Sequence, residues 1–285
     1  MRLSKIRIVL LGLAAFWIIW PIVTMVNEGL RIDIGPLFAG RGSSFVGRFF
    51  QPQGGIRPNP ITFIKAITLE NYPRTVLNST IIATISIGLA LLVGIPAAYS
   101  LVRHKFRGRG LLTILILMLR TLSPFAVIVP FFIVFSQIEL FDSYIGMALV
   151  YLIINIPIVT LMMRGFFADI PPQIYEAATT SGASEFQILR RIIIPLVIPG
   201  ILATVIFAFV ATWNEFLFAQ FLSGTTVKPV SRGVWSGFAE AIESFRVLDF
   251  DELNANAALA LVPALTLAFL IKKYIARGFT LGSVR

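Results

Sequence analysis

Six long apolar stretches constrain the fold of this 285-residue chain more than any other feature. A helix that crosses the hydrocarbon core of a membrane needs about 20 apolar residues, because each residue rises about 1.5 Å and the core is about 30 Å thick. The stretches that meet this requirement are 6–26, 76–102, 111–137, 144–163, 197–222 and 253–271. The sequence therefore predicts an all-α integral membrane protein with six transmembrane helices.

The composition agrees with a membrane location. Hydrophobic residues make up 57% of the chain and charged residues 13%, whereas soluble domains carry about 25% charged residues. Several stretches contain prolines, which membrane helices tolerate because neighbouring helices satisfy the freed carbonyl groups. Kinks are expected at Pro96, Pro124, Pro130, Pro157, Pro199 and Pro263.

The positive charges predict the orientation of the chain. If the N-terminus is cytoplasmic, 14 of the 24 Lys and Arg residues lie in the inner segments, and most acidic residues lie in the outer ones. The net charge of +10 is therefore a signal of topology, and we expect no nucleic-acid partner. Both termini are predicted to be cytoplasmic. The apolar run at 6–26 is longer than that of a typical signal peptide, so we interpret it as an uncleaved anchor in the cell membrane.

A polar segment at 171–195 interrupts the apolar sequence, and this topology places it in the cytoplasm, between the fourth and fifth stretches. Its two leading prolines suit the first turn of a helix, and Gly182 suits the left-handed residue that ends one. Ser184 and Gln187 have the spacing of a capping box for a second short helix. The side chains expected to share an apolar face on that helix are Phe186, Leu189, Ile192 and Ile193. The spacing alone fits both an ordinary surface hairpin and an element that binds a partner.

The chain lacks the residues that several kinds of chemistry require. It has no cysteine, and His104 is its only histidine, so we expect no metal site. No GxxxxGK[ST] run occurs, so the chain should not bind a nucleotide through a P-loop. We therefore assign no catalytic residue and expect no cofactor in this chain, and any ATP chemistry must come from a partner.

Two ionisable residues, Arg120 and Glu215, lie inside predicted spans, where a charge is costly and often functional. Each of them could pair with a polar neighbour or lie near an interface. Alternatively, they could line a translocation path together with Trp213 and Asn214, whose aromatic and amide groups suit a sugar. Trp213 could also be an interfacial anchor.

Residues 176–195 resemble the EAA loop of ATP-binding-cassette (ABC) importer permeases. The matching positions are Glu176, Ala177, Ala178, Gly182, Ile192, Ile194 and Pro195, with Ile194 in place of the family's usual leucine. Six spans with this loop between the fourth and fifth match the plan of type I importers. The strings at 78–110, 164–184, 213–223 and 277–285 are similar to carbohydrate permeases of the maltose (MalG-like) type.

The resemblance implies a mechanism and a set of partners. Such a permease pairs with a homologous second permease and sits on two ATPase subunits that bind ATP and Mg²⁺. Its sugar, a mono- or disaccharide of the maltose or trehalose type, comes from an extracellular binding protein, and the chain itself is a non-catalytic subunit. The EAA helices act as coupling helices in a cleft of each ATPase. Closure of the ATPases then turns the pathway outward.

The same resemblance assigns roles to individual residues. Glu176 would make a polar contact at the ATPase cleft, Ala177 and Ala178 would allow close approach, and Gly182 would make the bend. The tail that contains Arg277 and Gly278 would also reach the ATPases, and residues 223–252 would contact the binding protein.

The expected organisation is an N-terminal helix with a long extracellular segment at 1–75 and a core permease domain at 76–285. Three alternatives remain, and one of them is a channel or scaffold. An importer permease for a non-sugar solute would share the EAA loop. An ion-coupled secondary transporter would usually carry intramembrane acids and inverted repeats.

Overall fold

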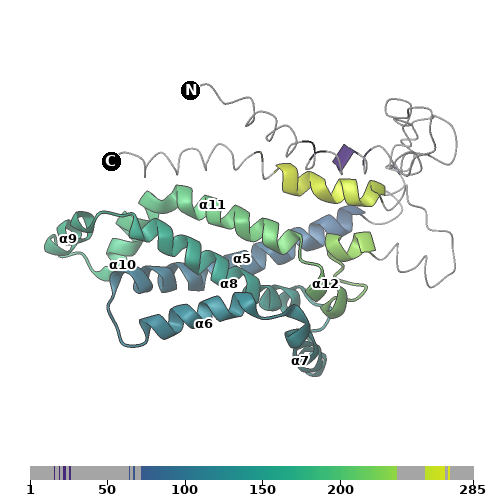
Figure 1. Cartoon of the computed structure of the whole chain (residues 1–285), viewed down its shortest axis with the longest axis horizontal. Coiled ribbons are helices and arrows are strands. Elements are labelled where there is room, and N and C mark those ends of the chain that lie inside the picture. The colour runs from purple at the N-terminus through teal and green to yellow at the C-terminus, as the bar shows by residue number, and fades with distance from the viewer. Residues whose placement is uncertain are drawn as a thin grey trace. The chain divides into compact units, whose positions relative to one another are not determined.

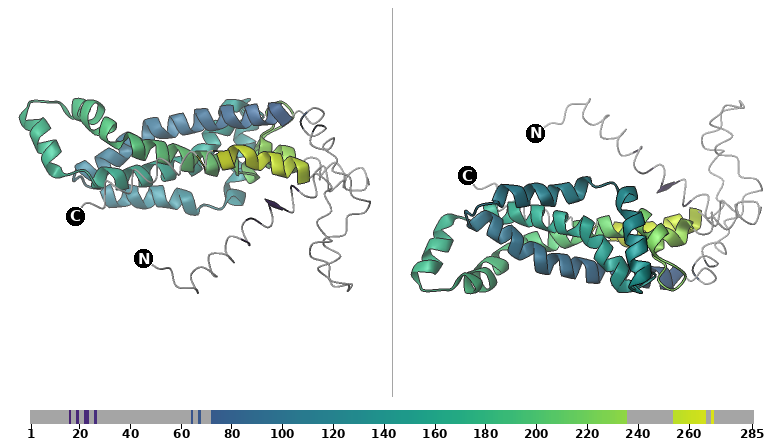
Figure 2. Two further views of the ribbon diagram at one scale, coloured as in Figure 1. Left: turned by 90° about the horizontal axis from the view of Figure 1, so that it is seen from above. Right: turned by 90° about the horizontal axis from the view of Figure 1, so that it is seen from below.

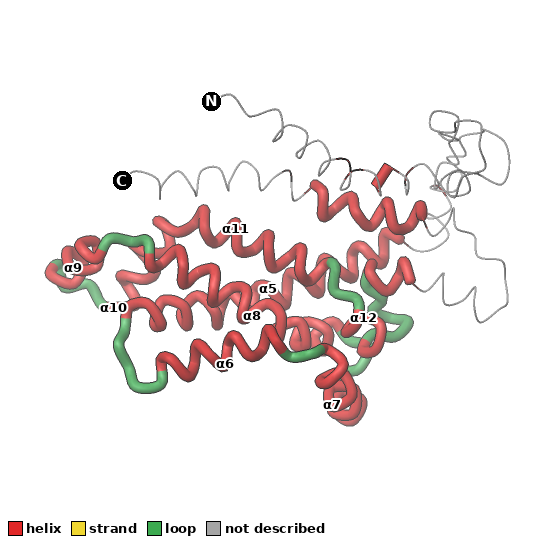
Figure 3. Tube along the Cα trace, viewed as in Figure 1, coloured by secondary structure: helices red, strands yellow, loops and turns green. Residues whose placement is uncertain are grey.

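The computed structural model describes residues 72–235 and 254–266, together with single positions at 16, 19, 22, 23, 26, 64, 67 and 269. Its helices are α5 (Tyr72–Arg103), α6 (Arg109–Thr121), α7 (Pro124–Gln137), α8 (Tyr144–Ala168), α9 (Pro172–Thr180), α10 (Glu185–Gln187), the π-helix η1 (Ile188–Ile193), α11 (Ile194–Trp213) and α12 (Leu217–Leu222). Residues 230–235 and 254–266 are also helical. No strand occurs among the described residues (Figures 1 and 3), which confirms the predicted all-α class for this part of the chain.

The chain divides into two packed units. The larger contains Thr75–Arg232 and Pro263–Arg285, and the smaller contains Met1–Arg74 and Gly233–Val262. Within the smaller unit, the Tyr72 hydroxyl donates a hydrogen bond to the Leu259 carbonyl at 2.6 Å. The predicted division into 1–75 and 76–285 stays a prediction, because most residues before 72 lie outside the described part.

In the larger unit, α5, α6, α8 and α11 run side by side as a bundle (Figures 1 and 2). Helix α8 packs against both α6 and α11. The segment around α9 and α10 projects from one end of the bundle, and α7 and α12 pack against each other at the opposite end. The bundle therefore separates the polar segment at 171–195 from the α7–α12 region by the full length of its helices.

Three described helical segments are long and apolar enough to cross a membrane: Tyr72–Arg103, Tyr144–Ala168 and Glu185–Trp213. The bent pair α6 and α7 makes a fourth if it is counted as one span. The predicted span 6–26 lies outside the described residues apart from single positions. Arg277 and Gly278 also lie outside the described residues. Span 253–271 is described as a helix over 254–266. The full count of six spans stays a prediction.

The kink predicted at Pro124 in the span at 111–137 is present, and it is a sharp break between two helices. Helices α6 and α7 meet at an angle of 90°. The cause is local, because a residue that precedes proline is pushed out of the α-helical region, and Ser123 before Pro124 is extended with φ −67° and ψ 127°. Leu122 is extended as well. In contrast, helices continue through Pro96, Pro130, Pro157 and Pro199.

The predicted limits of the span at 197–222 also need correction. The helical segment begins at Glu185, runs through η1 into α11 and ends at Trp213. The Glu215 carboxylate then accepts backbone N–H bonds from Leu217 and Phe218, both at 2.9 Å, and from Ala219 at 3.3 Å. A carboxylate that satisfies the free N–H groups of a helix start favours a new helix there. The chain therefore breaks after Trp213 and restarts as α12.

A buried polar cluster joins three helices of the bundle. The Asn155 side-chain amide of α8 donates to the Ser86 hydroxyl of α5 and to the Thr212 hydroxyl of α11, both at 2.9 Å. The Thr212 hydroxyl lies 3.1 Å from the Asn155 carbonyl oxygen. Such bonds between membrane helices contribute about 0.6 kcal/mol each on average. They fix the rotation of the three helices relative to one another.

Asp142, between α7 and α8, organises the opposite end of the bundle. Its carboxylate accepts backbone N–H bonds from Gly224 at 2.6 Å and from Thr226 and Val227 at 2.9 Å. Burial alone would raise the pKa of Asp142, but these backbone donors outweigh it and hold the pKa below its usual value. The carboxylate therefore stays charged and holds residues 224–227 against the start of α8.

Replacing Asp142 with asparagine should lower the stability of the folded protein by about 1–2 kcal/mol, because one neutral amide cannot accept all three bonds. A lowered folded-state pKa adds stability that is complete above the unfolded value, about 3.9, and is lost as pH falls through the folded value. Thermal unfolding in detergent between about pH 7 and pH 3 should show the gap between wild type and D142N shrinking in acid. A stability difference between wild type and D142N that does not change with pH would contradict the role of the charged Asp142 carboxylate.

Candidate functional site

The segment at 171–195 has the local structure that its sequence predicted. Pro172 is the first residue of α9, and Gly182 follows the C-cap with φ +78°. The Gly182 N–H donates to the Thr179 carbonyl at 2.9 Å, and the Ala183 N–H donates to the Ala178 carbonyl at 3.2 Å. This pair of bonds is the Schellman motif, in which the left-handed position favours glycine. The bend predicted at Gly182 is therefore present.

The capping box predicted for the second helix is also present. The Gln187 N–H donates to the Ser184 hydroxyl at 3.4 Å, and the Ser184 N–H donates to the Gln187 side-chain carbonyl at 2.9 Å. Helix α10 starts immediately after Ser184 and continues into η1. The bend at Gly182 thus joins two helical pieces, each with a defined end.

The apolar face predicted for the second helix was partly wrong. Phe186 is 68% exposed, whereas Ile188 and Ile193 are fully buried. The π-helix explains the difference, because its i→i+5 hydrogen bonds place residues five apart on one face. An α-helical spacing would instead align Phe186 with Leu189 and Ile193. The aromatic ring of Phe186 is consequently available on the surface.

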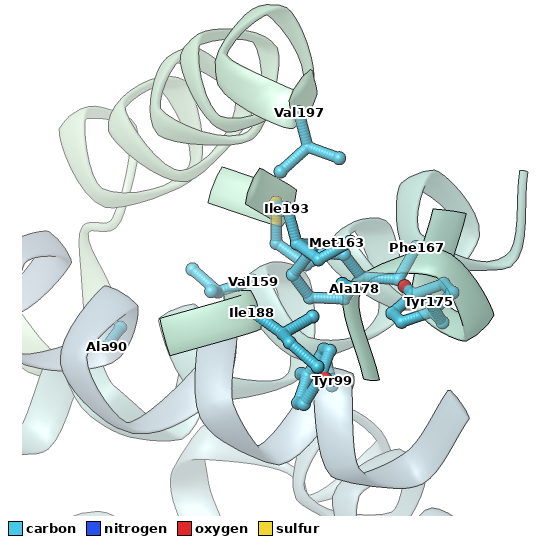
Figure 4. Close-up of a cluster of buried hydrophobic side chains, with 11 residues drawn as sticks. Ala90, Tyr99, Val159, Met163, Phe167, Tyr175, Ala178, Ile188, Ile193 and Val197 are labelled. Atoms are coloured by element: carbon cyan, nitrogen blue, oxygen red, sulfur yellow. The ribbon is translucent and has the colours of Figure 1, made fainter. Parts of the chain in front are cut away.

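A buried cluster attaches this segment to the helical bundle (Figure 4). Its members come from α5, α8, α9, η1 and α11 and are Ala90, Ala98, Tyr99, Val159, Met163, Phe167, Tyr175, Ala178, Ile188, Ile193 and Val197. The EAA residues divide between two faces of α9, because Ala178 is buried in this cluster while Glu176 and Ala177 are exposed. One face of the segment is thus packed on the helix ends, and the other is free to meet a partner.

The residues predicted for a translocation path do not form one surface. Trp213 is 4% exposed and stacks on Phe209, with ring centroids 5.2 Å apart. Asn214 is exposed, and its side-chain amide donates to the Val210 carbonyl at 2.8 Å. The Glu215 carboxylate caps α12, as described above. Arg120 is exposed in the last turn of α6, where a positive charge suits the helix dipole. Their role in a path stays a prediction.

Sequence reasoning missed two residues whose side chains hold distant segments of the chain together. Asp142 binds a segment more than 80 residues away, and Tyr99 contacts the polar segment from the end of α5. Neither residue lies in a motif, and both contacts join parts of the chain that are distant in sequence. Only the tertiary structure reveals them.

Comparison with known proteins assigns the family. Residues 90–280 match the family described as "Binding-protein-dependent transport system inner membrane component". The chain belongs to this family. It is 32% identical to the probable ABC transporter permease protein y4oR of Sinorhizobium fredii, over 95% of this chain and 92% of that protein. These findings make it an integral membrane permease of the ABC class, as the EAA resemblance implied.

Two further comparisons show what this ABC permease resembles in sequence and in fold. It is 27% identical to the diacetylchitobiose uptake system permease protein DasC of Streptomyces coelicolor, over 94% of this chain and 97% of that protein. Its fold matches a solved bacterial ABC transporter involved in the import of the acidic polysaccharide alginate. That match has a TM-score of 0.70 and 21% sequence identity, and covers 96% of this chain and 99% of the other.

Proposed function

We propose that this chain is the permease subunit of an ATP-driven, binding-protein-dependent sugar importer. In this proposal the segment at 171–195 faces the cytoplasm and docks on one of two partner ATPases, which bind ATP and Mg²⁺. A homologous second permease completes the pathway, and an extracellular binding protein delivers the sugar. The family description supports the binding protein as a partner, and the named activity of DasC supports a sugar as the substrate.

One observation carries the coupling part of this proposal. The segment has an exposed face with Glu176, Ala177 and Phe186, and a buried face with Tyr175 and Ile188 among others. The buried face packs on the ends of α5, α8 and α11. Packed protein interiors transmit small shifts. A partner that bound the exposed face and moved it would therefore displace the ends of three bundle helices. This arrangement suits a segment that passes the movement of an ATPase to the transmembrane helices.

The sugar assignment is tested best with the complete complex in proteoliposomes. We expect uptake of a labelled oligosaccharide to require ATP and the cognate binding protein, whose sugar ligand is first identified by calorimetry on a panel of sugars. Phosphate, peptides and polyols should not be taken up. Uptake of one of those solutes in place of a sugar would contradict the substrate class, and uptake driven by an ion gradient without ATP would contradict the importer class.

A further inference from the structure

Tyr99 connects α5 to the far side of the Gly182 bend. Its ring is 4% exposed, and its hydroxyl donates a hydrogen bond of 2.8 Å to the Glu185 carboxylate. Glu185 is the first residue of α10 and follows directly after the capping serine. The bond therefore joins the last turns of α5 to the second helical piece of the segment.

Helix α5 also contacts the near side of the same bend. The Arg103 guanidinium lies over the Tyr175 ring of α9, 5.1 Å from its centroid. The Tyr99 ring packs against Tyr175 with centroids 6.2 Å apart, and edge-on against Phe167 of α8 at 5.9 Å. One helix thus reaches α9 before the bend and α10 after it. Figure 4 shows Tyr99 below Ile188, with Tyr175 and Phe167 to their right.

The contact between Tyr99 and Glu185 is a hydrogen bond, whereas the other contacts of α5 with the segment described above are apolar packing and the cation–π contact of Arg103 with Tyr175. The buried apolar contacts around it transmit displacement, but the hydrophobic effect that drives them is non-directional and does not fix the register of α10 on α5. A hydrogen bond to a carboxylate is shorter, stronger and directional, and therefore fixes the register of the two groups. Among the described contacts of the segment with α5, this bond is the one that most tightly ties the position of α10 to that helix.

We propose that Tyr99 is a positioning residue that makes α5 follow the movement of the segment at 171–195, through its hydrogen bond to Glu185. The inference rests on the proposed function, in which that segment receives the movement of an ATPase. Without the bond, α9 and α10 would still dock on the partner, but only packing and the contact of Arg103 with Tyr175 would hold them on α5, so α5 would follow their movement less closely.

The test is the number of ATP molecules hydrolysed per solute imported by the complete complex in proteoliposomes. Tyr99→Phe keeps the buried ring and removes one donor, and Glu185 is exposed to solvent, so the variant should fold. We expect its ATP cost per solute to rise roughly three- to tenfold, the factor associated with one hydrogen bond. ATP hydrolysis itself should stay within about twofold of wild type, since the variant leaves the docking face intact.

Two further variants at Glu185 separate the hydrogen bond from general disruption. Glu185→Gln keeps a carbonyl acceptor for the Tyr99 hydroxyl and should remain close to wild type in ATP cost. Glu185→Ala removes the acceptor and should behave like Tyr99→Phe. A glutamine variant as poorly coupled as the alanine variant would overturn the role of the bond.

The chain offers a matched control at the other end of the bundle. The Tyr144 hydroxyl donates to the Asn78 side-chain carbonyl at 2.7 Å, so Tyr144→Phe loses a comparable bond far from the segment. We expect normal coupling for Tyr144→Phe. If Tyr99→Phe couples normally while Glu176→Lys uncouples, the inference about Tyr99 fails and the proposed function stands. If neither variant changes coupling, the proposed function fails.

Discussion

Reversing the charge of Glu176 is expected to stop solute uptake while ATP hydrolysis by the assembled complex continues. Glu176 is exposed on α9, and the next residues toward the bundle, Tyr175 and Ala178, are already packed in the buried cluster. The carboxylate is thus presented to the partner by a helix whose back is fixed. A lysine there would place a like charge against whatever cation the carboxylate meets, which costs far more than a lost contact at an interface.

We expect uptake by Glu176→Lys to fall roughly tenfold or more, with normal membrane insertion. The matched control is Glu139→Lys, which makes the same charge reversal at another exposed position, beyond the end of α7. The measurements are labelled-solute uptake and phosphate release on the same proteoliposomes. Normal uptake by Glu176→Lys, or an equal loss for both lysine variants, would contradict the coupling role of this segment.

Gly182→Pro tests the same joint through its backbone. Proline fixes φ near −65°, whereas Gly182 has φ +78°, and proline lacks the N–H that donates to Thr179. The Schellman turn cannot form, so α10 should leave α9 in a different direction and uptake should again be lost without loss of insertion. Space is not the cause, because no atom lies within 4 Å of a Cβ built on Gly182.

Gly94→Leu is expected to lower the stability of the helical bundle. A Cβ on Gly94 of α5 would lie 2.6 Å from the Val159 Cγ1 of α8 and 3.2 Å from the Thr160 hydroxyl. These helices can approach this closely because Gly94 has no side chain, as small residues allow in membrane helices generally. Overpacking of this kind costs about 1–3 kcal/mol, so the yield of folded protein and its thermal midpoint should both fall.

Gly88→Leu is the matched control for this loss. Gly88 lies on the same helix, and nothing stands within 4 Å of a Cβ built there. Because both substitutions replace a helical glycine, they change helix propensity by the same amount. Thermal unfolding in detergent should therefore separate them, with Gly88→Leu at least as stable as wild type. Equal midpoints for the two variants would show that α5 and α8 are not held at this contact.

The local structure around Gly182 was predictable because short-range rules determine it. The left-handed glycine, the capping box of Ser184 and Gln187 and the proline at the start of α9 depend on neighbours within five residues. The break at Pro124 was predictable in position but not in size. At the 90° bend both Leu122 and Ser123 are extended, and sequence alone predicts an extended conformation only for the residue that precedes proline.

The exposed position of Phe186 could not be predicted, because it depends on the hydrogen-bond pattern of η1. A π-helix is rarer than an α-helix. Here it allows both Ile188 and Ile193 to pack in the buried cluster. The role of Glu215 was missed for a similar reason. A carboxylate in an apolar stretch suggests a functional charge, and only the fold showed that three backbone N–H groups of α12 hold it.

The sequence by itself determined the class of protein, the position of the polar segment and the family, since these depend on apolar length, helix-end signals and the EAA pattern. The tertiary structure alone decided which face of that segment is free and which helix holds it. Tyr99 and Glu185 are 86 residues apart in the sequence, and Asp142 and Gly224 are 82 residues apart. No local rule relates either pair. Contacts between distant parts of a chain arise only when the helices pack, because packing sets which side chains come within hydrogen-bond reach.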